Sequence, residues 1–392
     1  SRSGNIWELH LSEKLLSIVH DGKNGNDKWK SVENWPQTFW KIGSKGKVVV
    51  LTVYVDDFVL AGPGSSDEWD SIRKVIRTTD PTIIGRVLGV HHHFDKKGTI
   101  VNTEIDMVDY VQQSVDLYNS TKGSDQFPLK NGVHYPWYEP TQLEIDTLGQ
   151  QPGVFGPNSA SLLMKALYCA RMVRLDICYT INTLSKYVTK WNALCDKQLK
   201  HLYSYLLTTS HTKLHGKVDS LDLDNVVLHG YPDADLAGTY DCTRATSGGF
   251  LELVGDNTFF PLDWFSKRQT ATSHSTTEAE LVSASKMLRE HLIPLQSLWS
   301  IMLGRPIKLV IHEDNMSTIT VIEAGYSPQL RYINKHHRIS LGLVNELCKH
   351  EDTTLQHCPT DKQKGDILTK GLARPKHEPA MHMVGLYPII IV

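Results

Sequence analysis

The sequence is short of the features that identify secreted, membrane-spanning and cysteine-stapled proteins. Its six cysteines include no paired C-x-x-C spacing, which argues against structural zinc and a disulfide framework and favours a reducing compartment. No uninterrupted apolar run reaches the roughly 18 residues of a membrane span. The N-terminus, Ser-Arg-Ser-Gly-Asn, has no apolar signal core and no initiator Met. The chain is therefore expected to be an excised piece of a longer intracellular protein, not a secreted one.

An excess of charge of either sign is also missing. The chain carries 41 Lys and Arg against 43 Asp and Glu, a formal net charge of -2. This balance does not indicate a nucleic-acid partner, but it does not exclude one, because basic patches act locally and metals neutralise acidic sites. With 392 residues, 40% hydrophobic and 21% charged, the chain is expected to form two or three globular domains.

Hydrophobic periodicity predicts the order of elements along the chain. The pattern indicates, in order, a polar leader without period (1–45), two strands folded over at Asp56-Asp57 (47–62), a helix (66–78), a strand pair (83–101), a helix (104–119), a connector rich in Gly, Pro, Asn and Asp (121–158), helices (159–209) and a second break (210–224).

Four acidic residues further on stand in settings suited to holding a metal ion. Asp233 follows a strand-like run, Glu280 opens an amphipathic segment that continues through Leu295 and Trp299, Asp314 ends the apolar run from Ile307, and Asp366 begins a short apolar segment. Any one of them taken alone reads as a solvated surface carboxylate. Together, at strand ends and helix starts, they predict carboxylates gathered for two hard cations, which suit attack of water on a phosphodiester.

The segments around these acids resemble the ribonuclease H domain of copia-type LTR retrotransposon Pol polyproteins. The resemblance rests on an ordered series over about 150 residues, namely Gly230 to Gly238, Thr246 to Gly249, Ser266 to Gln269, Ser275 to Leu281, Glu313 to Asn315, Lys335-His336, Thr360 to Gln363 and Gly365 to Lys370.

This resemblance implies that Asp233, Glu280, Asp314 and Asp366 are the catalytic metal ligands. Glu280 is favoured over Glu278, and Asp235 is a neighbour of the site. The implied reaction is cleavage of the RNA strand of an RNA–DNA hybrid by a two-metal mechanism, with Mg²⁺ as cofactor and Mn²⁺ as the substitute. The alternative is a catalytically silent retroelement remnant that at most binds nucleic acid.

The sequence departs from the family pattern in two places near these acids. Thr272-Ser273-His274 stands where small apolar residues are usual, and His312-Glu313 adds an acid beside Asp314. Neither departure removes a ligand.

A second pair of acids, Asp56-Asp57, interrupts an apolar run. A surface hairpin turn accounts for the pair, but Tyr54-Val55-Asp56-Asp57 also resembles the palm motif of reverse transcriptases. Polymerisation needs a further aspartate on an earlier palm strand, and the only preceding aspartates, Asp21 and Asp27, lie in a polar loop. The polymerase site is therefore predicted to be an incomplete remnant.

The resemblance gives an expected α/β organisation in four parts. These are an irregular leader (1–45), a partial α+β palm (46–120), a linker with a helical thumb or connection (121–224) and a ribonuclease H-like mixed five-stranded sheet flanked by helices (225–392). The expected partners are an RNA–DNA hybrid and the upstream Pol region, with no membrane, and the expected location is a cytoplasmic particle or the nucleus.

Several other residues have competing interpretations. Lys335, His336 and Arg338 either contact phosphates of the hybrid or cap a helix. His91-His92-His93 is expected in a solvated loop, because consecutive side chains cannot converge on a metal from a strand. His357 and Gln363 are candidates for a place near the fourth acid. Trp137 and Trp191 are expected to pack in the interior and not to stack on bases.

Overall fold

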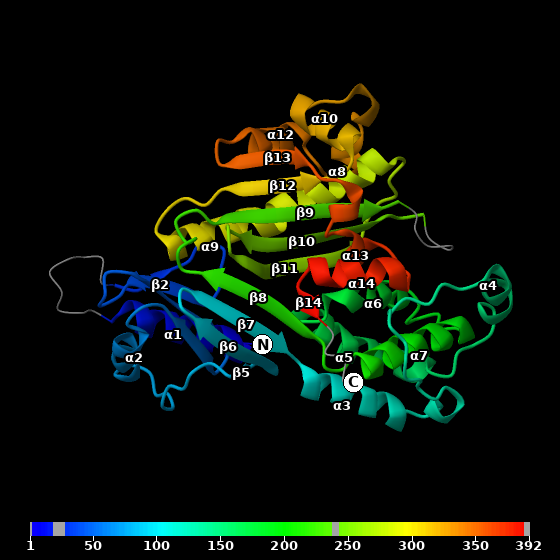
Figure 1. Ribbon diagram of the computed structural model, residues 1–392, viewed down its shortest axis with the longest axis horizontal. Helices are drawn as coiled ribbons and strands as arrows, with labels where there is room; N and C mark the ends of the chain where they lie inside the picture. Colours follow the sequence, from blue (N-terminus) through cyan, green and yellow to red (C-terminus); the bar gives the residue numbers. More distant parts are fainter. Residues whose placement is uncertain (1, 19–27, 237–242, 388–392) are drawn as a thin grey trace. The chain divides into compact units, whose positions relative to one another are not determined.

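The structure is a computed structural model that describes residues 2–18, 28–236 and 243–387 (Figure 1). Asp21, Asp27 and residues 388–392 lie outside these ranges. The chain forms two compact units, one of residues 1–87 and 290–307 and the other of residues 88–289 and 308–392. No helix within the described ranges is long and apolar enough to cross a membrane.

The first unit is built around an antiparallel sheet of order β1-β2-β3-β4. Its core joins the apolar side chains of Leu11, Leu51 and Ile72. The leader (1–45) was expected to be irregular. This expectation is wrong, because part of the leader forms a helix and two strands. The elements of the unit are α1 (Arg2–Leu16), β1 (Lys30–Ser31), β2 (Thr38–Ile42), β3 (Val48–Tyr54), β4 (Asp57–Ala61), α2 (Ser65–Arg73), β5 (Arg86–Val87) and α9 (Ile293–Leu303).

The predicted hairpin in this unit is confirmed. Strands β3 and β4 pair antiparallel with Tyr54 opposite Asp57, so Val55 and Asp56 form the two-residue turn. Val55 has a φ of 56°, the left-handed conformation that tight hairpin turns require. Asp56 and Asp57 are both exposed.

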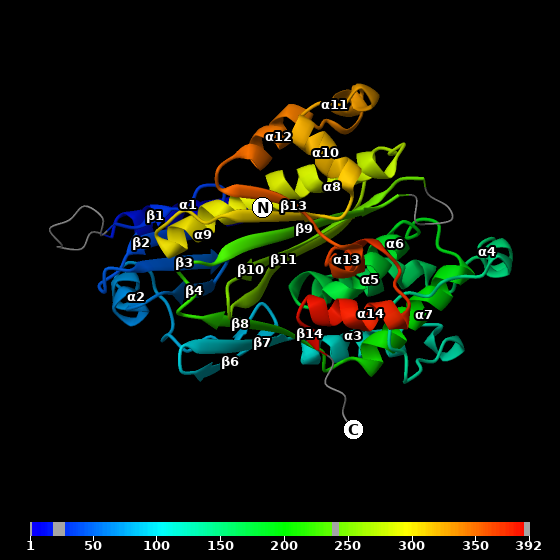
Figure 2. The same ribbon diagram turned by 45° about the horizontal axis from the view of Figure 1, so that its top comes forward.

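The second unit carries a larger mixed sheet (Figures 1 and 2). Its strand path runs β13-β12-β9-β10-β11-β8-β7-β6, and β14 pairs with β8. The strands are β6 (Val90–Lys97), β7 (Ile100–Asp106), β8 (Lys213–Asp219), β9 (Val227–Asp235), β10 (Thr246–Val254), β11 (Phe259–Arg268), β12 (Leu309–Glu313), β13 (Thr353–His357) and β14 (Leu386–Tyr387).

The five strands β9 to β13 form the mixed sheet that the sequence predicted. β10 pairs antiparallel with β9 and β11, whereas β12 runs parallel to β9 and β13 runs parallel to β12. The α/β fold class is therefore confirmed, although the sheet does not end at β11, because Phe259 pairs with Lys217 of β8.

The helices of this unit lie mainly between β7 and β8 and after β11. They are α3 (Val108–Ser120), α4 (Gln142–Leu148), α5 (Ser159–Met172), α6 (Cys178–Ser185), α7 (Ala193–Thr208), α8 (Thr276–Met287), α10 (Met316–Ala324), α11 (Ile333–His337), α12 (Leu341–Lys349), α13 (Asp366–Thr369) and α14 (Arg374–Met383).

Two adjacent glycines of β10 let helices approach both faces of the sheet. A Cβ on Gly248 would lie 2.5 Å from Thr369 Cγ2 of α13, and one on Gly249 would lie 2.3 Å from Met287 Cε of α8. Because successive residues of a strand point to opposite faces, α8 and α13 cover opposite faces of the central strands.

One hydrophobic core contains side chains both from the helices between β7 and β8 and from the central strands of the sheet. It includes Leu199 of α7, Phe250 of β10 and Leu368 of α13. The sequence predicted a domain boundary at residue 224, but residues on both sides of it share this one core. The assignment of 46–120 to a palm and of 121–224 to a connection stays a prediction.

One local expectation is wrong. His91, His92 and His93 lie on strand β6 and not in a loop. The segment from Glu280 to Trp299 is helical throughout, as its periodicity indicates, but it is not one regular α-helix. α8 ends at Met287, a π-helical turn follows (Leu288–Leu292), and α9 continues with Pro294 in its first turn. Proline lacks the N–H that a regular α-helix would need there.

Candidate metal centre

The central strands bring two of the predicted acids to one edge of the sheet. Asp233 lies near the end of β9, and Asp314 directly follows β12. These strands are parallel neighbours with Gly230 opposite Ile311, so their carboxyl ends meet at the same edge. β9 is also bonded along its whole length to β10, with Asp233 opposite Gly248, which fixes the backbone that carries the first acid.

Helix α8 supplies the third acid. Ser275 caps this helix by accepting a hydrogen bond from the Glu278 N–H at 3.1 Å, which suits a serine N-cap. About two turns of helix away from the cap, Ser283 Oγ donates to the Gly248 carbonyl oxygen at 2.8 Å. Glu280 lies between these two anchors, so its position relative to β9 and β10 is set by the helix as a whole.

Asp233, Glu280 and Asp314 converge. One carboxylate oxygen from each lies within 4.8 Å of the others. Asp233 is 1% exposed and Glu280 is 6% exposed, and the buried Glu280 Oε2 has no hydrogen-bond partner among the described residues. Clustered, unpaired carboxylates are unfavourable in a protein interior. The residues present therefore fit a hard divalent cation bound by oxygen ligands.

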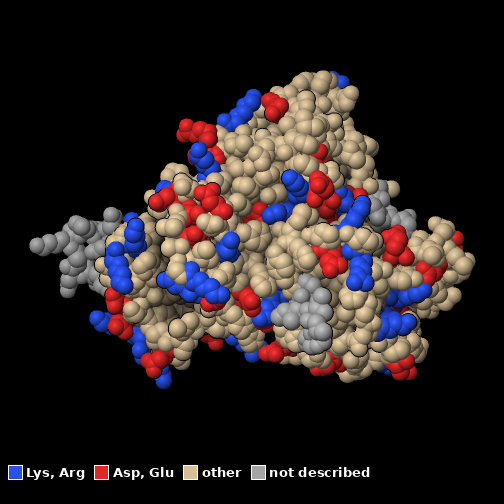
Figure 3. Space-filling model, in the orientation of Figure 1, with Lys and Arg blue, Asp and Glu red and all other residues tan. Residues whose placement is uncertain are grey.

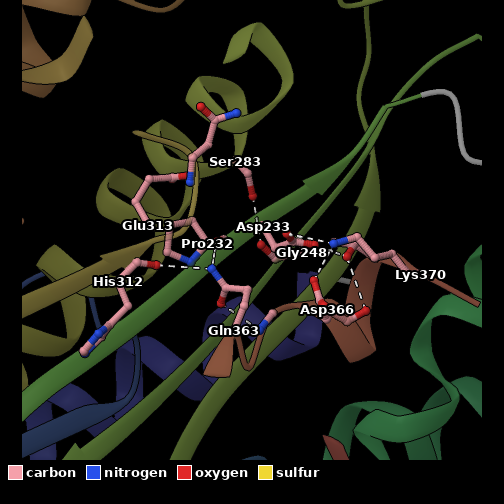
Figure 4. A network of polar contacts seen from close by, with 12 residues as sticks. Pro232, Asp233, Gly248, Ser283, His312, Glu313, Gln363, Asp366 and Lys370 are labelled. Atoms are coloured by element: carbon pink, nitrogen blue, oxygen red, sulfur yellow. Dashed lines mark hydrogen bonds and ion pairs between the residues drawn. The ribbon is translucent and has the colours of Figure 1, made fainter. Parts of the chain in front are cut away.

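Asp366, the fourth predicted ligand, lies at the start of α13 but is not part of this group of three. Figure 4 shows Lys370 between Asp233 and Asp366. Lys370 Nζ forms an ion pair with Asp366 Oδ1 and lies 3.4 Å from Asp233 Oδ1. Thr369 Oγ1 donates to Asp233 Oδ2. A lysine and a threonine thus neutralise and orient the acids on the α13 side, a role that sequence reasoning did not assign to either.

Burial and mutual repulsion raise the pKa values of these acids. Burial, followed by the charges of Asp233, Glu313 and Asp314, raises the pKa of Glu280 to about 11. Burial and Asp233 also raise the pKa of Asp314, and they raise that of Asp366 to about 6. The metal-free site therefore holds protons at neutral pH, and binding of a cation would release them.

Gln363 joins the elements that carry three of the predicted acids. Its Nε2 donates to the carbonyl oxygens of Pro232 at 2.9 Å and His312 at 3.3 Å, and its Oε1 accepts from the Gly365 N–H at 3.1 Å (Figure 4). The side chain is 1% exposed. Gln363 therefore braces β9, β12 and the start of α13 against one another.

Glu313, the additional acid noted in the sequence, is fully buried. Its Oε1 accepts from the Asn315 N–H at 3.1 Å, and its Oε2 has no hydrogen-bond partner among the described residues. Burial raises its pKa well above the usual range. Asp235 lies outside the group of three, and its expected place as a neighbour of the site stays a prediction.

The other predicted residues do not belong to this group of three. Asp56 and Asp57 belong to the first unit. Lys335, His336 and Arg338 are exposed, the first two on α11 and the third directly after it. Trp137 is 5% exposed and Trp191 is 8% exposed, so both pack in the interior as expected. Over the face drawn in Figure 3, basic and acidic side chains are interspersed.

No protein-family model matches the chain, but several curated proteins do. A retrovirus-related Pol polyprotein from transposon TNT 1-94 of Nicotiana tabacum is 22% identical over 90% of this chain and 25% of its own length. A putative transposon Ty5-1 protein of Saccharomyces cerevisiae is 24% identical over 73% of this chain and 84% of its own length. A Pol polyprotein from transposon RE1 of Arabidopsis thaliana is 24% identical over 97% of this chain.

The chain spans about a quarter of the length of the tobacco and Arabidopsis relatives. Among solved structures, a foamy viral protease–reverse transcriptase in complex with double-stranded DNA covers 79% of this chain and 46% of its own, at 12% identity and a TM-score of 0.36. An LC11 ribonuclease H1 isolated from compost covers 36% of this chain and 92% of its own, at 11% identity and a TM-score of 0.25.

Proposed function

This chain belongs to the copia-type LTR retrotransposon Pol family, and from that premise we propose that its second unit is a metal-dependent ribonuclease H acting on RNA–DNA hybrids inside the cell. The observation that carries the proposal is the convergence of Asp233, Glu280 and Asp314, with carboxylate oxygens within 4.8 Å of one another. Asp366 is proposed as the fourth ligand, because Lys370 links it to Asp233.

The three converging acids would hold Mg²⁺, with Mn²⁺ as a substitute. When bound, the metal would activate water and neutralise charge on the scissile phosphate. Thr369 and Lys370 hold the Asp233 carboxylate in place. Gln363 keeps the strand ends together, so the ligands are preorganised before a substrate arrives.

Substrate binding is proposed to use Lys335 and Arg338, which are exposed cations close in sequence. Contacts of this kind go to phosphates and position the duplex without reading its sequence. Discrimination of RNA from DNA would depend on the 2′-hydroxyl.

Cleavage of labelled substrates tests the proposal. With Mg²⁺, the wild type is expected to cut the RNA strand of an RNA–DNA hybrid and to leave duplex DNA intact. Asp233→Asn should lower the rate by at least about a hundredfold, which corresponds to roughly 2.7 kcal/mol of lost transition-state stabilisation. Asp256→Asn, which alters an exposed acid between β10 and β11, should cut like the wild type. Equal cutting by the wild type and Asp233→Asn would refute the proposal.

A catalytically silent remnant that binds nucleic acid is the second candidate. Lys370 favours it, since its ammonium already neutralises Asp233 and Asp366 without a metal. This candidate predicts that the hybrid binds with the same affinity with and without Mg²⁺ and that no strand is cut.

A further inference from the structure

A second cluster of metal-ligating side chains lies outside the acidic site, where α11 meets the N-terminus of α8. One ligand atom from each of Glu278, His336 and His337 lies within 4.8 Å of the others. Glu278 is two residues before Glu280 on α8, but it faces α11 and not the acidic cluster. The acidic site described above makes no use of these three residues.

The two oxygens of Glu278 have different surroundings. Oε2 accepts hydrogen bonds from the His274 N–H at 2.7 Å and from the Tyr332 hydroxyl at 2.9 Å. Oε1 has no hydrogen-bond partner among the described residues, although it lies 2.9 Å from His337 Nε2. The residue is fully buried. One oxygen therefore anchors the carboxylate, and the other forms an ion pair with an imidazole nitrogen.

The hydrogen bond of His336 leaves its other ring nitrogen available. His336 Nε2 lies 2.9 Å from the Thr272 carbonyl oxygen. A carbonyl oxygen only accepts, so Nε2 carries the ring proton, and Nδ1 of the neutral ring keeps its lone pair. Histidines that bind metals commonly donate their second N–H to a backbone carbonyl in this way.

His274 lies beside the three ligands. Its ring centroid is 5.9 Å from that of His336 and 5.7 Å from the ring of Tyr332. The side chain is exposed and belongs to the Thr272-Ser273-His274 segment that departs from the family pattern. The imidazole of His274 is thus close enough to serve as the fourth ligand. If it does not, a water molecule from solvent can take that position.

We propose that Glu278, His336 and His337 form a second metal site that takes Zn²⁺. Two imidazoles and one carboxylate are a ligand set typical of zinc and unlike the all-oxygen set that Mg²⁺ requires. Ligands of tetrahedral zinc lie roughly 3.4 Å apart, since Zn–N and Zn–O distances are about 2.1 Å. Modest side-chain adjustment brings the three atoms to that spacing.

Zinc at this position links three pieces of the chain. Glu278 belongs to the first turn of α8, His336 and His337 end α11, and Thr272 and His274 lie in the segment that leads into α8. The site therefore fastens α11 to the helix that carries Glu280. Its role is structural, and it does not depend on ribonuclease activity.

Competition with a chromophoric chelator tests the site. After removal of metals, the whole chain is expected to bind one equivalent of Zn²⁺ that millimolar Mg²⁺ does not displace. His336→Gln and His337→Gln should each weaken Zn²⁺ binding by at least about tenfold. His350→Gln, which alters an exposed histidine elsewhere in the same unit, and Asp314→Asn, in the acidic site, should each leave the affinity within about twofold.

Cobalt substitution adds a readout that does not depend on the amount of zinc bound. Co²⁺ in the wild type should give visible absorption of a low-coordinate nitrogen and oxygen site, and His336→Gln should abolish it. Because His336 is exposed, this variant is expected to keep the fold, which metal-free circular dichroism checks. Unchanged Zn²⁺ affinity in both histidine variants would overturn the proposal. Loss of Zn²⁺ binding only in Asp314→Asn would assign the zinc to the acidic site, and this result would also overturn the proposal.

Discussion

The convergence of acidic side chains at one place changes the pKa of the Glu280 carboxyl group. In solution a glutamate is ionised at neutral pH, but burial and three neighbouring acids raise the pKa of Glu280 to about 11. The folded chain binds a proton there that the unfolded chain has released, so between roughly pH 4.5 and 11 this residue lowers stability as pH rises. This proposed metal ligand thus destabilises the metal-free fold at neutral pH.

Replacement of Glu280 by glutamine removes this destabilisation of the metal-free fold. Glu280→Gln mimics the protonated side chain, so in EDTA at pH 7 it should raise the free energy of unfolding by about 1–3 kcal/mol. Added Mg²⁺ should stabilise the wild type by linkage and the variant much less. Urea unfolding with and without Mg²⁺ measures both effects.

Glu323→Gln, which changes an exposed acid on α10, is the matched control and should respond to Mg²⁺ like the wild type. Destabilisation of the metal-free chain by Glu280→Gln, or an undiminished response of that variant to Mg²⁺, would contradict this account of the site.

Elements of secondary structure meet at the acidic site through a few buried polar contacts. Gln363 satisfies backbone groups of β9, β12 and the start of α13. Ser283 links α8 to β10. These contacts orient whole elements, so their loss should move several ligands together without removing any of them.

Gln363→Ala tests that role. Loss of its side chain leaves buried backbone groups unpaired, which should cost about 2–4 kcal/mol of stability. Because Asp233 and Asp314 lose their common brace, the Mg²⁺ concentration for half-maximal hybrid cleavage should rise severalfold. The chain remains folded only if its stability exceeds this loss, which urea unfolding establishes first.

Gln150→Ala, at an exposed position after α4, is the comparison variant. It should change neither the free energy of unfolding nor the Mg²⁺ concentration for half-maximal hybrid cleavage. A Gln363→Ala protein that is less stable but has the same Mg²⁺ requirement as the wild type would show that Gln363 supports the fold alone and does not position the ligands.

At the scale of the whole molecule, the core of the second unit buries a network of ionisable groups. Arg174 and Asp176 form a buried ion pair at 2.8 Å, and the Tyr205 hydroxyl donates to Asp176. His377 of α14 is 2% exposed and lies 3.2 Å from the Tyr205 oxygen. Burial lowers the pKa of His377 to about 4, so the folded unit holds this ring neutral.

The second unit should therefore lose stability as pH falls from about 6.5 toward 4. In this window the unfolded chain binds a proton on His377 that the folded chain does not, and stability rises with pH wherever the unfolded state binds more protons. The expected loss from this residue is about 1–3 kcal/mol. Urea unfolding followed by tryptophan fluorescence at pH 7 and pH 4.5 measures it.

His377→Gln should reduce the difference between the two pH values, and His350→Gln, at an exposed position, should not. Half-buried His229 and buried His312, whose pKa values burial lowers to about 4 and about 3, contribute to the pH dependence that remains. An unchanged difference in His377→Gln would show that this ring is protonated in the folded state.

Patterns local in sequence were predicted well because they depend on neighbours along the chain. The β3–β4 hairpin and α2 follow from alternating and helical spacing of apolar residues. The irregular leader was wrong, since the α1 side chains Leu11 and Leu15 are buried by partners that are distant in sequence. The segment from Glu280 to Trp299 is helical as its pattern indicates, but a π-helical turn interrupts it at Leu288–Leu292, and its residues are shared between the two units.

The sequence by itself determined the α/β class and the family, and it singled out Asp233, Glu280 and Asp314 as candidate ligands, because ordered motifs keep chemically distinctive residues at recognisable places. Only the tertiary structure decided that these three acids converge while Lys370 engages Asp366, and that Glu278 faces two histidines instead of the acidic site. The cysteine spacing that argued against zinc could not reveal such a site. The physical reason is that distances between side chains from separate elements are set by packing, which no spacing along the chain records.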